Sequence, residues 1–245
     1  MACIFILLGL GAFVFAFLLF ISAPYGRHRR GGWDPQINGR AGWILMEFPA
    51  VAVFAFLFFA GINSKSPAAV VFLALWEFHY LYRAFLFPAL MRGSSVMPVV
   101  IVLMGILFNV LNAYINARSL FTFSGGYPAS WLLDPRFLVG SIIFLAGFSI
   151  HFTSDRILRN LRKPGETGYK IPAGGLFRFI SCPNYFGELI QWLGWAVATW
   201  SLAGLVFFLW TFANLFPRAL SHHRWYKARF PDFPRARRAI IPFIL

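Results

Sequence analysis

The chain has 245 residues, of which 59% are hydrophobic and only 12% are charged, and its formal net charge is +14. A soluble domain of this size cannot bury so large an apolar fraction, so lipid must serve as part of the solvent. The basic residues lie in loops beside hydrophobic runs, which is the membrane pattern and argues against nucleic acid as a partner. Membrane lipids and an anionic cofactor are the partners that this charge favours.

Seven hydrophobic runs are long enough to cross a bilayer. They lie near residues 2–22, 43–62, 67–90, 98–118, 136–155, 183–199 and 202–220. The first run has no basic N-terminal region and no small-residue cleavage site, so we interpret it as a retained helix. The sequence therefore predicts an all-α protein, a bundle of seven transmembrane helices that forms a single membrane domain over residues 1–245.

The distribution of Lys and Arg predicts the orientation of this bundle. Nearly all basic residues fall in the loops at 23–42, 91–97 and 156–182 and in the tail after Arg218. By the positive-inside rule, these loops and the C-terminus are cytoplasmic and the N-terminus is outside. An endoplasmic reticulum membrane and a bacterial inner membrane both fit this multi-pass topology.

The two cysteines, Cys3 and Cys182, lie at opposite ends of the sequence in unlike contexts. We therefore expect no disulfide, and the sequence contains no metal-ligand spacing. It also lacks a Rossmann glycine pattern and a P-loop. A dinucleotide would have to bind inside the helical bundle by another route.

Ionisable side chains at membrane depth are the first candidates for function, because each is costly to place there. They are Glu47, Glu77, Arg83 and Glu188. Tyr80 lies in the same run as Glu77 and Arg83. The alternative is an ion-pair network that merely holds helices together. For Tyr80, the residue type alone favours a tyrosine that packs in the core.

Glu47 and Tyr80 together suggest a carbonyl-binding site. Pro49 follows Glu47 closely and predicts a kink that frees backbone groups around the carboxyl. A protonated Glu and a Tyr can both donate a hydrogen bond. Two such donors that converge in an apolar cavity would polarise a ketone oxygen and stabilise an enolate. This chemistry suits a hydrophobic enone.

A basic helix end and the following hydrophobic run predict an anion site on the cytoplasmic side. Asp155, Arg159 and Arg162 recur at about one helical turn, and Arg suits phosphate. Asn184 and Glu188 are four residues apart on the next run and could hydrogen-bond a carboxamide. The alternatives are lipid headgroup binding for the arginines and interhelical hydrogen bonds for Asn184 and Glu188.

Several sequence blocks, taken in order, resemble the steroid 5α-reductase family over essentially the full chain. The longest is Ser154-Asp-Arg-Ile-Leu-Arg-Asn-Leu-Arg-Lys-Pro-Gly-Glu166, which continues into Tyr169–Phe177. The other blocks are 25–28, 43–47, 79–83, 183–188, 198–201, 218–226 and 241–245. Single blocks are weak signals, whereas their joint order and spacing are specific.

The resemblance implies NADPH-dependent reduction of the Δ4 double bond of a small-molecule 3-oxo steroid, with no obligate protein partner. Glu47 and Tyr80 would be catalytic, polarising the enone while hydride is delivered to C5 and a proton to C4. The implied cofactor-binding residues are Arg92, His151, Asp155, Arg159, Arg162, Tyr169, Asn184, Glu188, Arg218, His222 and Tyr226. No metal is implied.

Some positions depart from the family pattern. His151 stands where the family commonly has Asn, the 91–97 loop replaces a more polar Arg-containing loop, and Gln191 stands where an acidic residue is frequent. The first two departures affect the expected contacts to the cofactor, and Gln191 affects the expected shape of the steroid pocket.

Three other functions remain open from the sequence. The first is reduction of another lipid enone or enoyl substrate, such as a polyprenal or an enoyl thioester. The second is an S-adenosylmethionine-dependent methyltransferase of the isoprenylcysteine type, whose C-terminal region can show a motif like Pro183-Asn-Tyr185. The third is a membrane scaffold without chemistry, which the buried carboxylates and the basic cytoplasmic segments argue against.

Overall fold

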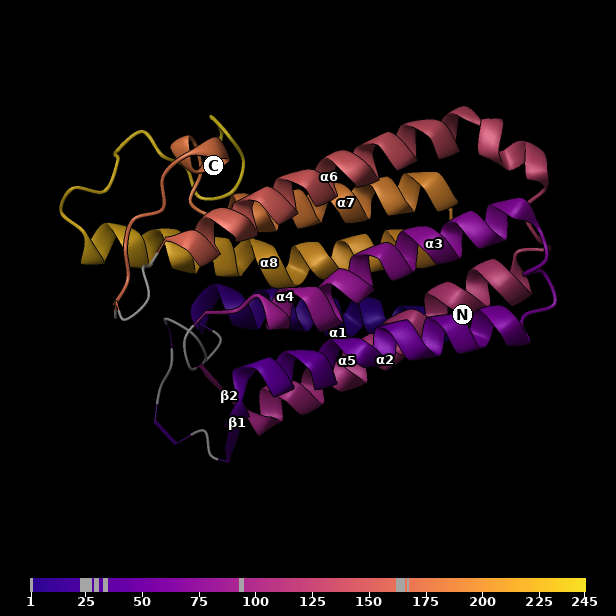
Figure 1. Cartoon of the computed structure of the whole chain (residues 1–245), viewed down its shortest axis with the longest axis horizontal. Coiled ribbons are helices and arrows are strands. Elements are labelled where there is room, and N and C mark those ends of the chain that lie inside the picture. Colours follow the sequence, from indigo (N-terminus) through magenta and orange to yellow (C-terminus); the bar gives the residue numbers. More distant parts are fainter. Residues whose placement is uncertain are drawn as a thin grey trace. The chain divides into compact units, whose positions relative to one another are not determined.

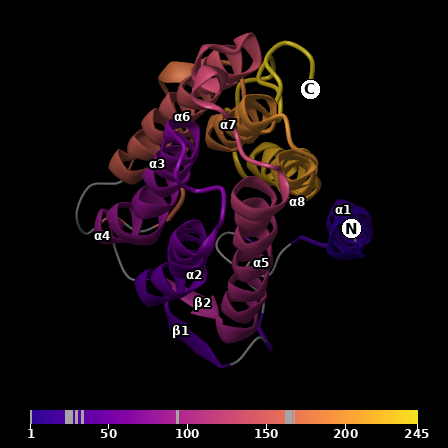
Figure 2. The same cartoon turned by 90° about the vertical axis from the view of Figure 1, so that its right-hand side faces the viewer.

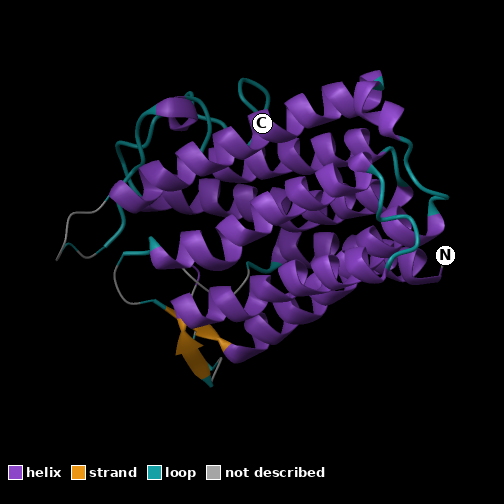
Figure 3. Cartoon of the chain, turned by 45° about the vertical axis from the view of Figure 1, so that its right-hand side comes forward, coloured by secondary structure: helices purple, strands orange, loops and turns teal. Residues whose placement is uncertain are grey.

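The computed structural model describes residues 2–22, 28, 31–32, 35–92, 95–161, 166 and 168–245. Within these ranges the chain is mostly helical, with one small two-stranded ribbon (Figure 3). The chain divides into two compact units. The first unit comprises residues 1–23, 139–198 and 204–245, and the second comprises 24–138 and 199–203. The prediction of a single membrane domain stays a prediction.

The second unit is built around helix α2 (Gly39–Ala60), which packs against both α3 (Pro67–Leu81) and α5 (Val99–Arg118). A π-helical turn, η2 (Tyr82–Leu86), and the short α4 (Phe87–Ala89) continue α3, and a second π-helical turn, η3 (Ser119–Phe123), continues α5. The 3₁₀ turn η4 (Ala129–Leu133) leads into α6. Figure 2 shows α2 and α5 side by side.

Local sequence signals explain where these helices begin. The Asn38 side chain accepts hydrogen bonds from the main-chain N–H groups of Arg40 and Ala41 and so caps α2. Ser66 caps α3 by accepting from Ala69, and Pro67 follows at the first helical position, where its missing N–H costs nothing. The core of the unit is aromatic, with the Phe54 ring stacked on Trp76 at a centroid distance of 4.3 Å.

The ribbon is a departure from the predicted all-α class. Strands β1 (Gln36–Asn38) and β2 (Val96–Pro98) pair antiparallel, with Ile37 opposite Met97. They directly precede α2 and α5, so the ribbon joins the starts of two adjacent helices (Figure 1). Three residues per strand are too few for an alternating pattern to stand out in the sequence.

The first unit contains α1 (Ala2–Phe20), most of α6 (Pro135–Asn160), the 3₁₀ turn η5 (Gly175–Arg178), α7 (Pro183–Thr199) and most of α8 (Leu202–Arg229). Helices α7 and α8 lie side by side in Figures 1 and 2. Helix α1 packs on α8, where Gly11 lies against the Trp210 ring and Phe15 stacks on Phe212. Ser22, just after α1, hydrogen-bonds Ser221 of α8 at 2.5 Å.

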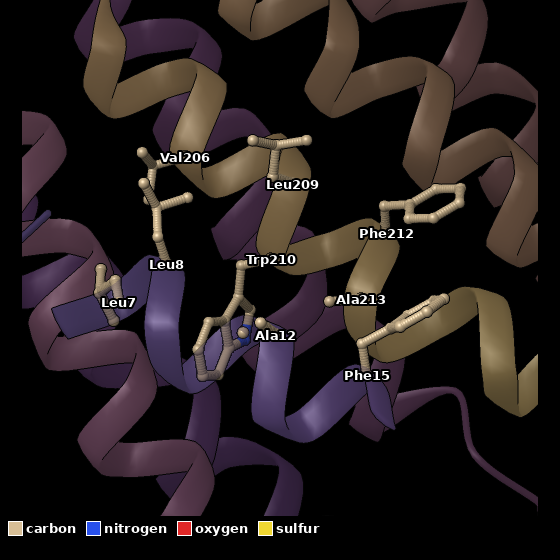
Figure 4. Close-up of a pocket in the computed structure, with 10 residues that line it drawn as sticks. Leu7, Leu8, Ala12, Phe15, Val206, Leu209, Trp210, Phe212 and Ala213 are labelled. Atoms are coloured by element: carbon tan, nitrogen blue, oxygen red, sulfur yellow. The ribbon is translucent and has the colours of Figure 1, made fainter. Parts of the chain in front are cut away.

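An apolar pocket of about 220 Å³ lies between α1 and α8. Figure 4 shows Leu8 of α1 beside Val206 of α8, and Phe15 of α1 beside Ala213 of α8. No charged side chain lines it, so it offers dispersion contacts alone.

The seven predicted hydrophobic runs each coincide with a helix. In the described part of the chain, five helical segments are long and apolar enough to cross a membrane. They are 39–60, 67–89, 99–123, 135–160 and 202–229. A shorter apolar helical segment, 5–20, lies in α1, and α7 has 17 residues. Helices α6 and α8 continue beyond the predicted runs, because their polar C-terminal residues remain helical past the hydrophobic stretch.

Candidate active site and cofactor site

Glu47 is buried in α2, with 9% of its surface exposed, and is held from two sides. The Asn109 amide of α5 donates to Glu47 Oε2 at 3.2 Å and to the Met46 main-chain oxygen at 2.7 Å. On the other side, Arg83 Nη2 lies 3.7 Å from Glu47 Oε1. The carboxyl is therefore fixed between an amide and a guanidinium at the depth of an apolar helix.

Arg83 is placed by the π-helical turn η2. Its guanidinium lies beside two aromatic rings that meet edge to face, 4.5 Å from the Trp43 centroid and 4.7 Å from the Phe87 centroid. Cation–π contacts of this kind favour Arg over Lys, because the planar guanidinium can pack on aromatic faces. The π-turn thus directs one charge to the carboxyl of α2.

Tyr80 is also buried, at 3% exposure, on α3. Its ring packs against Trp76 and edge-on against His79. The Asn112 amide of α5 donates to the Tyr80 hydroxyl at 3.4 Å. The indole N–H of Trp76 in turn donates to the main-chain oxygen of Ala50, which ties α3 to α2.

The two predicted catalytic residues are thus each bonded to α5. Their partners, Asn109 and Asn112, are three residues apart and so lie on one face of that helix, about one turn from each other. Asn116 continues the row and bonds Asn112. Our sequence reasoning missed all three asparagines. Their spacing of three and four residues within an apolar run was the available signal, because buried amides in membrane helices are costly unless paired.

Glu77, a further candidate from its depth in the membrane, remains outside these contacts. Its Oε1 atom is enclosed and makes no hydrogen bond to the described part of the chain.

In the first unit, α6 and α7 bring together a polar cluster that includes four of the predicted cofactor residues. His151 Nε2 lies 3.3 Å from Asp155 Oδ2, and His151 Nδ1 lies 3.7 Å from Glu188 Oε2. The Asn184 amide lies 3.4 Å from Asp155 Oδ1, and its main-chain oxygen is 3.3 Å from His151 Nδ1. His151 and Asp155 are almost fully buried. The cluster presents amide, carboxylate and imidazole groups within one small region.

Two glycines allow this close approach of α6 and α7. A Cβ added to Gly147 would collide with the backbone of Gln191, and one added to Gly187 would collide with the backbone of His151. Small residues at such crossings let helix backbones approach closely in membranes. The position of His151 beside Asn184 and Glu188 therefore depends on residues that carry no side chain.

Two further predicted residues, Arg218 and His222, lie on α8 and meet Tyr185 at the start of α7. Arg218 donates to the Tyr185 hydroxyl at 3.0 Å, and His222 Nε2 lies 3.2 Å from the same oxygen. The Arg218 guanidinium also lies over the Tyr185 ring. Tyr185 was not among the predicted site residues, although it stands in the Pro183–Glu188 block.

Tyr226 is 2% exposed and stacks on Phe233 of the C-terminal tail, with a centroid distance of 5.5 Å. The tail is fixed by main-chain bonds to the segment before α7, including Ser181 N to Arg238 O at 2.9 Å. Arg237 of the tail is buried over the Phe233 ring, and burial lowers the pKa of its guanidinium. Tyr226 thus connects α8 to the chain end.

The remaining predicted cofactor residues lie apart from these two groups, or are not among the residues that the structure describes. Arg159 is in the last turn of α6, and Tyr169 is exposed and packs edge-on against Trp225. Arg92 lies in the second unit after α4 with an exposed side chain. Arg162 lies outside the described residues. In the described part of the chain, no group of three or more His, Cys, Asp or Glu side chains could hold a metal ion.

Comparison with known proteins identifies the family. The family model described as 3-oxo-5-alpha-steroid 4-dehydrogenase matches residues 95–245. The chain is 42% identical to 3-oxo-5-alpha-steroid 4-dehydrogenase 1 of Bos taurus, covering 96% of this chain and 93% of the relative. It is 40% identical to the steroid 5-alpha-reductase DET2 of Arabidopsis thaliana, covering 99% and 95%. The full-length resemblance expected from the sequence blocks is confirmed, and the chain belongs to the 3-oxo-5-alpha-steroid 4-dehydrogenase family of enzymes.

Proposed function

We propose that the protein catalyses NADPH-dependent reduction of the Δ4 double bond of a 3-oxo steroid to the 5α-reduced 3-oxo product. The observation that carries this proposal is the pairing of two buried side chains with one face of α5, the Glu47 carboxyl through Asn109 and the Tyr80 phenol through Asn112. Family membership supports the reaction, since the relatives are named for it.

In this proposal Glu47 and Tyr80 bind the 3-oxo oxygen. Tyr80 donates a hydrogen bond to it, and Glu47 donates a second when it carries a proton. Both donors withdraw electron density from C5 through the conjugated enone and stabilise the negative charge that develops on the oxygen. NADPH, when bound, supplies the hydride that C5 accepts. A proton then adds at C4, and the enolate returns to a ketone.

The residues of the first unit fit NADPH by the chemistry of their donors and acceptors. The Asn184 amide can donate to and accept from the carboxamide of the nicotinamide end, and the Glu188 carboxylate can accept from the carboxamide or the ribose. Asp155 suits a ribose hydroxyl. Arg218 presents a planar guanidinium that matches phosphate. The other proposed cofactor residues are His151, Arg159, Arg162, Tyr169, His222, Tyr226 and Arg92. The excess of basic residues favours NADPH over NADH, because the 2′-phosphate needs additional cations.

We also propose that α1 and α7 complete a bundle of seven spans, with the N-terminus outside and the C-terminus cytoplasmic. The basic loops and tail support this orientation. The active site would then open to the cytoplasm, from an endoplasmic reticulum membrane or a bacterial inner membrane.

The test is NADPH oxidation by the purified detergent-solubilised protein, with and without progesterone or testosterone, while the 5α-reduced product is followed. Steroid-dependent oxidation with that product is the expected result. NADPH binding without steroid reduction would move the substrate to another lipid enone or an enoyl thioester. Binding of S-adenosylmethionine in place of NADPH would instead favour the methyltransferase.

Variants then assign the roles. Glu47→Gln and Tyr80→Phe should each sharply lower turnover while leaving the NADPH dissociation constant unchanged, whereas Arg162→Ala should weaken NADPH binding. A scaffold without chemistry would lose nothing but some stability in the first two variants.

A further inference from the structure

The face of α5 that meets Glu47 and Tyr80 carries three buried amides. Asn109, Asn112 and Asn116 have exposures of 5%, 2% and 1%. They recur at intervals of three and four residues, so they form one polar row on a helix whose opposite face carries exposed Leu103, Met104 and Leu107. Burying polar groups at membrane depth costs free energy, so such groups usually mark a functional site.

The hydrogen bonds in this row have a defined direction. Asn116 Nδ2 lies 3.1 Å from the main-chain oxygen of Asn112, which can only accept, so this atom of Asn116 must be the donating nitrogen. The same nitrogen lies 3.0 Å from the Asn112 side-chain oxygen. That contact in turn requires Asn112 to present its oxygen to Asn116 and its nitrogen to the other side.

The other side of the Asn112 amide is Tyr80. Because the Asn112 nitrogen faces the phenol, at 3.4 Å, the Tyr80 oxygen is the acceptor in this bond and its proton takes no part in it. If the Asn112 amide were rotated by 180°, its oxygen would face the phenol and accept the Tyr80 proton. Two donors would then oppose each other between Asn112 and Asn116.

We propose that Asn112, oriented by Asn116, is a positioning residue that makes Tyr80 a hydrogen-bond donor to the substrate. The inference rests on the proposed function, in which Tyr80 donates to the 3-oxo oxygen. A ligand carbonyl can only accept, so it needs a phenol whose proton is directed at it. Preorganising that proton before the substrate binds avoids reorganisation during the reaction.

The variant that tests the proposal is Asn112→Leu, which keeps similar volume and removes both the donor and the acceptor. We expect kcat/KM for a 3-oxo-Δ4 steroid to fall about tenfold, the scale of one buried hydrogen bond. The NADPH dissociation constant should not change. Affinity for the 3-oxo steroid should fall, while affinity for the same steroid lacking the 3-oxo group should stay constant, which a general loss of structure would not produce.

A double-mutant cycle with Tyr80→Phe gives the decisive readout. If Asn112 acts through Tyr80, Asn112→Leu should have almost no further effect on kcat/KM in the Tyr80→Phe background. Asn116→Leu should lower kcat/KM in the same direction by a smaller factor, about threefold. It leaves the direct contact to Tyr80 in place, so it also tests the proposal if Asn112→Leu fails to fold and bind NADPH.

Tyr114→Phe is the matched control, because it removes a hydroxyl from the exposed face of the same helix and should leave turnover unchanged. If Asn112→Leu lowers kcat/KM by the same factor in the native and the Tyr80→Phe backgrounds, Asn112 does not act through Tyr80. That result would overturn the proposal and leave the proposed function intact. Full activity of Tyr80→Phe, or no steroid-dependent NADPH oxidation by the native protein, would instead reject the proposed function itself.

Discussion

Arg83 reaches Glu47 from a π-helical turn rather than from a regular helix, with its Nη2 atom 3.7 Å from Glu47 Oε1. Both side chains are about nine-tenths buried. The rings of Trp43 and Phe87 cover the guanidinium. A charge buried to this extent is stabilised by its partner and by the rings, and removal of the partner leaves it uncompensated.

We therefore expect Arg83→Gln to be strongly destabilising. Removal of one member of a buried pair leaves the other unpaired and costs about 3 kcal/mol of unfolding free energy. In the double variant Glu47→Gln/Arg83→Gln, part of this loss should be recovered. Thermal unfolding in detergent measures both. Lys170→Gln is the control, since it breaks the exposed pair with Glu166 and should change stability little. Strictly additive losses from the two buried substitutions would contradict coupling.

We propose that Arg218 binds a cofactor phosphate, and its hydrogen bond to the Tyr185 hydroxyl holds the guanidinium in position. Arg218→Lys should raise the NADPH dissociation constant about tenfold, because Lys retains the charge but loses the planar two-nitrogen geometry. Tryptophan fluorescence quenching by NADPH measures the constant. Arg224→Lys is the matched control on an exposed position of the same helix. Equal affinities in both variants would place the phosphate elsewhere.

Much of the helical fold could be predicted from hydrophobic run length, because lipid forces each crossing segment to be helical. The helix that begins at Gly39 and the one that begins at Pro67 also carry recognisable caps in Asn38 and Ser66. The π-turn at Tyr82–Leu86 could not be predicted, since its sequence is ordinary for a helix.

The candidate site was predicted in part, and the reason is visible in its chemistry. Glu47 stood out as a charge at membrane depth. Asn109 and Asn112 did not, because a neutral amide does not carry the cost of burying an ion. Tyr185 was overlooked because an aromatic residue at the start of an apolar helix usually serves packing.

Gly147 permits the α6–α7 contact that holds the His151 cluster together. Gly147→Ala should force the two backbones apart, lower the unfolding free energy by about 1–3 kcal/mol and weaken NADPH binding. Thermal unfolding with and without NADPH measures both effects. Gly9→Ala is the control, since a Cβ at Gly9 meets nothing within 4 Å in the described structure. Tolerance of alanine at Gly147 would mean that α6 and α7 can separate without disturbing the cluster.

Tyr127 gives stability a pH dependence in the alkaline range. The residue lies in the segment between α5 and α6, donates to the Thr199 main-chain oxygen at 2.8 Å and packs edge-on against Phe72. Burial raises the pKa of its phenol from 10.0 to about 12, because the charged form loses solvation. The folded protein therefore holds the proton more tightly than the unfolded chain does.

The stabilisation that follows is fully present below the unfolded pKa of 10.0 and is lost as pH rises toward about 12. The melting temperature of the native protein should thus fall between pH 9.5 and 11, about where the unfolded chain begins to lose this proton. Tyr127→Phe should be less stable at pH 8, through loss of the bond to Thr199, and should show a shallower decline over the alkaline range. Parallel declines in the two proteins would show that other groups cause the alkaline loss and that the Tyr127 proton is held no more tightly after folding.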